Sequence, residues 1–270
     1  MPAIDLARLK KQSAQLADLF DQPEFFIETL SGVLDYYVNR TLRKHDAVAP
    51  MSVLPTYRTP PEVLHQIETE LGPLAEKNPS QALDLADRLW DAGYLETRLL
   101  AAGLLGRIPP KEEPLLARLT AWTQQVRDPN VRAALLTTSL SRLRRDAPEH
   151  FLTLVSEWFH PARQRLWSNG IQALLPLIAD PEFDNLPPIF ELIEPVLEAA
   201  PAVIQNDLAD LIQALYAASP TETTYLLKLV LNNSDNPMTA VTMRRILSSF
   251  PQALQIELRD LVRSSARKPK

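Results

Sequence analysis

The sequence predicts an all-α protein, a HEAT-like solenoid in which antiparallel helical hairpins stack into a curved shell. Apolar residues recur at helical spacing along nearly the whole chain, as in Ala82–Ile108, where leucines mark two stripes on either side of Ala92-Gly93. Alternating strand-like runs and Asn-Gly or Asp-Gly hairpin turns are absent. The 270 residues include 6 glycines and 24 prolines, a balance that suits frequent helix ends rather than β-turns.

Helix starts recur along the chain wherever proline follows a small or polar residue, as in Asp128-Pro129 and Asn236-Pro237. Such a pair supplies a cap residue and then a proline at the first helical position. The second helices of successive hairpins are therefore expected over Tyr94–Arg107, Val131–Arg144, Arg163–Leu177, Val203–Ala217 and Thr239–Phe250. These starts lie roughly 30 to 40 residues apart, which is the period of HEAT and related repeats.

Three parts of the chain are expected. Residues 1–52 form an N-terminal helical cap, with helices over Ile4–Phe20 and Phe25–Lys44. Residues 53–262 form the repeat domain, in which neighbouring hairpins bury the apolar faces that one hairpin alone leaves exposed. Residues 263–270 are basic and lack large apolar side chains, so they are expected to be a disordered tail.

Composition excludes several classes of site. Cysteine is absent, so neither a disulfide framework nor a thiolate metal site can form. The four histidines show no metal-ligand spacing, and no motif for a phosphate loop or a nucleophilic serine occurs. No signal peptide and no apolar run of about 18 residues is present. We expect a cytoplasmic monomer that needs no cofactor or metal and does not enter membranes. Gly103 and Gly106 are expected to permit close helix packing.

The segment Pro79–Pro110 resembles the helical pair of the DNA alkylation repair family, the AlkD-like alkylpurine DNA glycosylases. The matching residues are a leucine-tryptophan pair, an acidic residue, an arginine and an alanine-rich helix: Leu89, Trp90, Glu96, Arg98, Ala101 and Ala102. Upstream, Val53-Leu54-Pro55 with Arg58 is similar to the family's short Val-Pro loop. Fewer residues match over the rest of the span from about Val53 to Phe250.

The resemblance implies a shell that grips duplex DNA on a concave basic face and excises bulky or cationic alkylated purines without flipping the base into a snug pocket. Family members carry paired tryptophans followed by an aspartate in the catalytic region. The corresponding stretch 126–131 has no tryptophan, and Asn130 falls about where the aspartate would be. Asp128 is the nearest candidate for a catalytic carboxylate, although it also suits a helix cap. Activity of the 3-methyladenine or 7-methylguanine glycosylase type is therefore left open.

Arginines recur near the expected starts of successive second helices, and they are the predicted DNA-binding residues together with one tryptophan: Arg98, Arg132, Arg163, Arg165, Trp167, Arg244 and Arg245. Equivalent positions in stacked repeats lie along one line, with about 10 Å between neighbouring helices. Guanidiniums in such a row can follow a phosphate backbone. The alternative is an internal ladder in which an aspartate before each turn pairs with the arginine after it, as in Asp128 with Arg132.

Two functions are consistent with these patterns. The first is a DNA alkylation repair family protein that binds alkylated or distorted duplex on its concave face, with weak or no excision. The second is a non-enzymatic HEAT-repeat scaffold for a protein partner. The net charge of -5 favours the scaffold, as do Gln205 and Asn206, which interrupt the row of arginines. A continuous positive face would favour DNA, and a mixed or apolar face would favour a protein.

Overall fold

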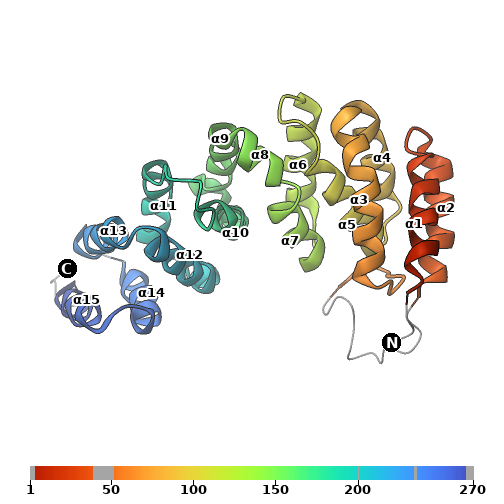
Figure 1. The fold of residues 1–270 in the computed structure, drawn as a ribbon. Coiled ribbons are helices and arrows are strands. Elements are labelled where there is room, and N and C mark those ends of the chain that lie inside the picture. The colour runs from red at the N-terminus through yellow and green to blue at the C-terminus, as the bar shows by residue number, and fades with distance from the viewer. Residues whose placement is uncertain (1–3, 39–51, 200, 234–235, 266–270) are drawn as a thin grey trace. The chain divides into compact units, whose positions relative to one another are not determined.

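The structure is a computed structural model that describes residues 4–38, 52–199, 201–233 and 236–265. Within these ranges every regular element is a helix and no strand occurs, so the prediction of an all-α helical-repeat fold is confirmed. The chain divides into two compact units, Met1–Pro148 and Glu149–Lys270. Helices in each unit pack against neighbours close in sequence, as expected of a repeat protein (Figure 1).

The first unit begins with the two helices expected of the cap. Its elements are α1 (Leu6–Ala17), α2 (Pro23–Tyr36), α3 (Pro61–Lys77), α4 (Pro79–Asp91), α5 (Leu95–Leu105), α6 (Glu113–Gln125), α7 (Pro129–Thr137) and α8 (Ser141–Asp146). Helices α1, α3, α5 and α7 pack side by side in one layer, and α2 packs on α4 in the other (Figure 1). Pro61, Pro79 and Pro129 each occupy the first helical position.

The second unit repeats this arrangement. Its elements are α9 (Pro148–Trp158), η1 (Pro161–Leu166), α10 (Trp167–Ile178), α11 (Pro187–Ala199), η2 (Ala202–Ile204), α12 (Gln205–Ala218), α13 (Pro220–Asn233), α14 (Pro237–Ile246), η3 (Leu247–Ser249) and α15 (Gln252–Ser265). Helix α12 packs between α10 and α14, and α13 packs between α11 and α15. None of the helices in the described ranges is both long and apolar enough to cross a membrane.

Several helix boundaries differ from the prediction. The helix expected over Val131–Arg144 is two helices, α7 and α8, because the chain turns where Ser139 donates a 2.8 Å hydrogen bond to the carbonyl of Ala102. Helix α15 continues to Ser265, so residues 263–265 are helical rather than disordered, and residues 266–270 lie outside the described ranges. The helix expected over Phe25–Lys44 ends at Tyr36, and the part from residue 39 onward is likewise not described.

The segment Ser52–Thr59 has no regular structure and runs along the N-terminal ends of α5 and α7; we call it the strap. Glu96, in the first turn of α5, is 2% exposed. Its carboxylate accepts hydrogen bonds from three groups of the strap: the Thr56 hydroxyl at 2.6 Å, the Tyr57 amide at 3.0 Å and the Thr59 amide at 3.4 Å. A buried carboxylate with three donors holds the strap on α5.

Candidate nucleic-acid interface

Asp128 is the N-cap of α7 and binds the other end of the strap. It is 1% exposed. One carboxylate oxygen accepts from the amides of Asn130 and Val131, at 2.9 and 3.1 Å. The other oxygen accepts from the Ser52 hydroxyl at 2.7 Å and the Val53 amide at 2.8 Å. With four donors and no exposed oxygen, Asp128 is arranged as a structural cap rather than as a carboxylate facing a sugar.

These hydrogen bonds also set the charge of Asp128. Burial by itself would raise the pKa of the carboxyl, but the bonds from Ser52, Val131, Val53 and Asn130 outweigh burial and lower its pKa below the usual value. Asp128 is therefore ionised near neutral pH, with its negative charge at the positive end of the α7 dipole.

Arg98 packs on a tryptophan pair that is not adjacent in sequence. The rings of Trp90 and Trp122 stack with centroids 4.2 Å apart and an interplanar angle of 8°. The Arg98 guanidinium lies 4.7 Å from the centroid of the Trp90 ring, and its Nε donates to the Trp90 carbonyl at 3.2 Å. Both rings are at least nine-tenths buried, so the stack mainly fixes Arg98 between helices.

Arg132 occupies the same position in α7 as Arg98 in α5, the fourth residue of the helix. Neither guanidinium pairs with a carboxylate within the described ranges, and the carboxylate of Asp128 is bonded elsewhere. The alternative arrangement, a ladder pair between Asp128 and Arg132, is therefore not formed. Arg98 and Arg132 occupy equivalent positions, as expected, and the guanidinium of Arg98 lies on the Trp90 ring.

The predicted DNA-binding residues of the second unit differ in exposure and in their position on the helices. Arg163 and Arg165 are exposed in η1, where Arg163 pairs with Glu157 at 3.6 Å. Trp167 is only 3% exposed and its indole N–H donates to the His160 carbonyl at 3.3 Å, so its ring is enclosed in the core. Arg244 and Arg245 were predicted near the start of a helix, and this prediction is wrong. Helix α14 begins at Pro237 and ends at Ile246, so both arginines lie in its last turn.

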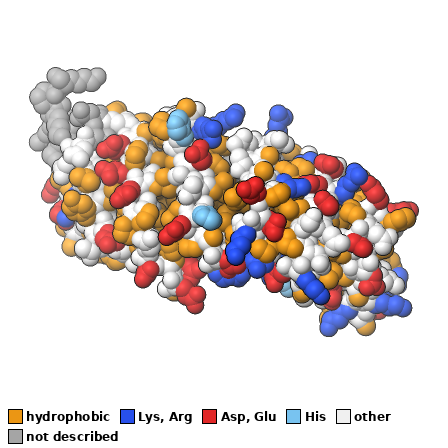
Figure 2. Space-filling model, turned by 90° about the horizontal axis from the view of Figure 1, so that it is seen from above, with side chains coloured by type: hydrophobic (Ala, Val, Ile, Leu, Met, Phe, Trp, Pro, Cys, Tyr) orange, Lys and Arg blue, Asp and Glu red, His pale blue; other side chains and the backbone are white. Residues whose placement is uncertain are grey.

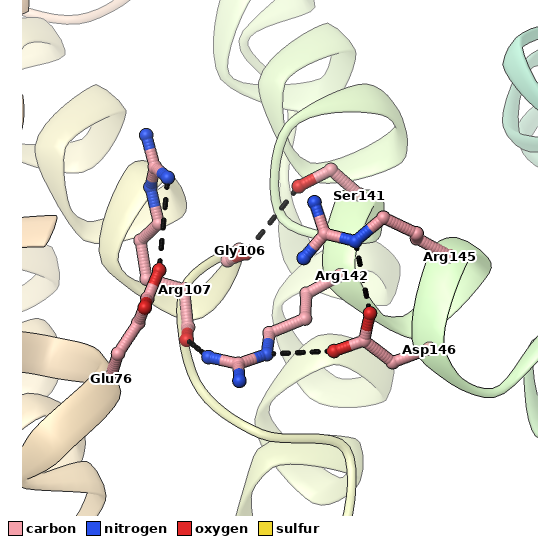
Figure 3. Close-up of polar contacts among 7 residues, drawn as sticks. All are labelled: Glu76, Gly106, Arg107, Ser141, Arg142, Arg145 and Asp146. Carbon is pink, nitrogen blue, oxygen red and sulfur yellow. Dashed lines mark hydrogen bonds and ion pairs between the residues drawn. The ribbon is translucent and has the colours of Figure 1, made fainter. Parts of the chain in front are cut away.

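A basic cluster that the sequence reasoning missed lies where α5 ends and α8 begins (Figure 3). Arg142 donates to the carbonyl of Arg107 and, at 3.0 Å, to Asp146; Arg145 donates to the same carboxylate at 2.9 Å. Arg107 lies 3.8 Å from Glu76. We call Arg107, Arg142 and Arg145 the arginine cluster. The run of arginines at 142, 144 and 145 is the sequence signal that indicates it.

Members of the arginine cluster differ in exposure. The side chain of Arg142 is 21% exposed and both of its bonds are to protein, so it fixes the geometry. The side chains of Arg107 and Arg145 are 56% and 70% exposed. Burial would raise the pKa of Asp146, but hydrogen bonds from Arg145 and Arg142 lower it, so its carboxylate stays charged. The guanidiniums of Arg107 and Arg145 remain exposed beside these ion pairs, and such groups suit a phosphate oxygen.

A small cavity of about 50 Å³ adjoins the arginine cluster between α3 and α5. Arg107 and Glu68 line it together with two glycines, Gly72 and Gly103, and apolar side chains. Within the described ranges, no three acidic or histidine side chains converge to hold a metal ion.

Charges of both signs share the molecular surface. On the face drawn in Figure 2, acidic and basic side chains are interspersed with apolar ones. On this face, a binding surface for a polyanion would have to be a local group of arginines rather than a broad positive area.

Comparison with known proteins gives one match. The family model described as DNA alkylation repair enzyme matches residues 61–249, which is more than half of the chain and spans helices of both units. No curated protein and no solved structure shows significant similarity to the chain.

Proposed function

Because this chain belongs to the DNA alkylation repair enzyme family, we propose that it binds duplex DNA, alkylated or distorted, by contacts between its arginines and phosphates. The arginine cluster is the observation that carries this proposal. Arg142 is fixed by two bonds, and the exposed Arg107 and Arg145 flank it. A guanidinium that protein contacts already fix before binding loses less side-chain entropy when a phosphate binds. Such contacts give affinity without sequence preference.

Removing the two exposed guanidiniums of the cluster tests this proposal. Arg107→Gln/Arg145→Gln is expected to weaken binding to a labelled duplex and to lower the slope of log K against log salt by about 0.9 for each lost phosphate contact. Fluorescence anisotropy across a salt series measures both. Arg88→Gln is the matched control, since Arg88 is exposed on α4 and already pairs with Glu24 at 2.6 Å. An equal loss of duplex affinity in Arg107→Gln/Arg145→Gln and in Arg88→Gln would refute the proposal. Absence of duplex binding even at low salt would also refute it.

The arginines predicted from the sequence are proposed as further phosphate contacts. Arg98 and Arg132 form the equivalent pair in the first unit, and the second unit supplies Arg163, Arg165, Arg244 and Arg245. Charge reversal at Arg163 and Arg165 is expected to weaken duplex binding in low salt. Unchanged affinity in that variant would restrict the interface to the first unit.

We further propose that binding occurs without base excision. Asp128 has no exposed oxygen for a cationic sugar. By the resemblance described above, Asn130 falls about where the family's aspartate would be. Incubation with a methylated duplex is therefore expected to release no more 7-methylguanine or 3-methyladenine than a protein-free sample, as measured by chromatography of the freed bases. Release above that background would show that the chain is a glycosylase.

A protein-binding scaffold is the second candidate, and the interspersed charges on the face in Figure 2 favour it. The salt titration separates the two functions. Binding of duplex with a slope that depends on Arg107 and Arg145 supports the DNA interface. Absence of duplex binding at low salt leaves the scaffold.

A further inference from the structure

Glu68 lines the cavity beside the arginine cluster and has an unusual environment for a carboxylate. One of its oxygens lies against α5 so closely that a Cβ at Gly103 would be 2.9 Å from it. The cavity walls are otherwise leucine side chains, Gly72, Thr138 and Arg107. Glycine at position 103 therefore creates the space that the carboxylate occupies.

The Glu68 carboxylate makes no hydrogen bond or ion pair within the part of the chain that the structure describes. Burial raises its pKa, and the charges of His65 and Arg107 oppose that shift. A half-buried carboxylate without donors is costly to keep ionised, so a ligand that donates hydrogen bonds to it gains affinity. The carboxylate of Glu70, which is also on α3, already accepts a hydrogen bond from the side-chain amide of Gln66 at 3.0 Å.

Cavity size and position restrict the ligand. A volume of about 50 Å³ exceeds the roughly 10–15 Å³ that one water requires by the same measure, so the cavity admits a few waters or the edge of a ring rather than a whole base. Arg107 lies at the same cavity with its guanidinium exposed. A ligand that fits both groups carries adjacent N–H donors on one part and an anionic group on another.

We propose that Glu68 and Arg107 together bind an unpaired guanine nucleotide of the bound DNA, with the N1–H and N2–H edge of the base at Glu68 and its phosphate at Arg107. Guanine presents two adjacent donors on its pairing edge, which match the two oxygens of a carboxylate; adenine and thymine lack this pair. The edge is free only where the base is unpaired. This inference rests on the proposed DNA binding and adds a preference among distorted duplexes.

Labelled duplexes that differ at one position test the preference by anisotropy. We expect a duplex with a single unpaired guanine to bind about tenfold more tightly than the fully paired duplex, the effect of a charge-assisted hydrogen bond. An unpaired inosine, which lacks the N2 amino group, should lose most of this gain, as should unpaired adenine. Glu68→Gln should abolish the guanine preference while binding paired duplex as the wild type does. Glu70→Gln should retain the preference.

Gly103→Ala provides a second variant should Glu68→Gln fold poorly. The added methyl displaces the end of the flexible Glu68 side chain, not backbone, so the protein is expected to fold and to lose the guanine preference. Equal binding of paired and guanine-bulged duplexes by the wild type overturns this inference and leaves the proposed function intact. A preference that persists in folded Glu68→Gln also overturns it. Failure to bind any duplex at low salt overturns the proposed function, and the inference falls with it.

Discussion

Asp128→Ala is expected to lower the free energy of unfolding by about 3 kcal/mol, the sum of a lost helix cap and of buried donors left without an acceptor. The substitution removes the acceptor of four hydrogen bonds, two of which hold the strap at Ser52 and Val53. Urea unfolding followed by circular dichroism measures the change. Asp5→Ala is the control, because Asp5 caps α1 with one exposed bond to the Arg8 amide. Its loss should be about 1 kcal/mol or less.

The same carboxylate predicts a pH dependence. The pKa of Asp128 is lower in the folded chain than in the unfolded one, so the unfolded state binds the proton more readily in acid. The stabilisation is complete above the ordinary pKa of an aspartate and disappears as pH falls through the lowered folded value. Unfolding curves of the wild type and Asp128→Ala should therefore converge in acid. A difference that is unchanged from neutral to strongly acidic pH would contradict the ionised cap.

Local patterns predicted the cap but not its second role. Asp128 before Pro129 identifies an N-cap from two adjacent residues, because the donors that it satisfies are on the next turn. Its bonds to Ser52 and Val53 join residues 76 and 75 positions apart. The strap has no helical periodicity, so nothing in its sequence indicated which helix ends it would contact. The fold class followed from periodicity, whereas the site depends on contacts distant in sequence.

The tryptophans show the same limit. The sequence contains no two adjacent tryptophans, yet the rings of Trp90 and Trp122 stack with centroids 4.2 Å apart because α4 and α6 bring them together. Trp167, predicted to bind DNA, is buried, as Trp90 and Trp122 are. Spacing along the chain gives a residue's face on its own helix, but not the packing of neighbouring helices against that face.

The sequence identified the arginines but not the directions of their side chains. Arg98 and Arg132 do occupy equivalent positions, as the repeat pattern predicted. The arginine cluster was missed because Arg107 follows the end of α5 and Arg142 follows a turn that the sequence predicted as helix. Helix ends are the least determined positions in a periodic pattern, since the last turns bury little apolar surface.

Gly106→Ala is expected to destabilise the protein by about 3 kcal/mol, at the upper end of the cost of overpacking. The close packing predicted at Gly103 and Gly106 is confirmed, and a Cβ at Gly106 would lie 2.2 Å from the carbonyl oxygen of Thr138, which is backbone and cannot rotate away. Gly32→Ala is the matched control: a Cβ at this glycine of α2 meets nothing within 4 Å. That variant should instead gain about 0.5–1 kcal/mol from helix propensity. Urea unfolding of both variants measures the contrast.

The Gly106 contact also links stability to the proposed interface. The carbonyls of Gly106 and Arg107 accept from Ser141 and Arg142 on α8, so a methyl group that separates α5 from Thr138 also moves these acceptors away from α8. Arg142 then loses the bond that fixes it between Arg107 and Arg145. We therefore expect the folded fraction of Gly106→Ala to bind duplex more weakly than the wild type, with Gly32→Ala unchanged. Wild-type affinity in a destabilised Gly106→Ala protein would mean that the arginine cluster does not need this packing to bind phosphate.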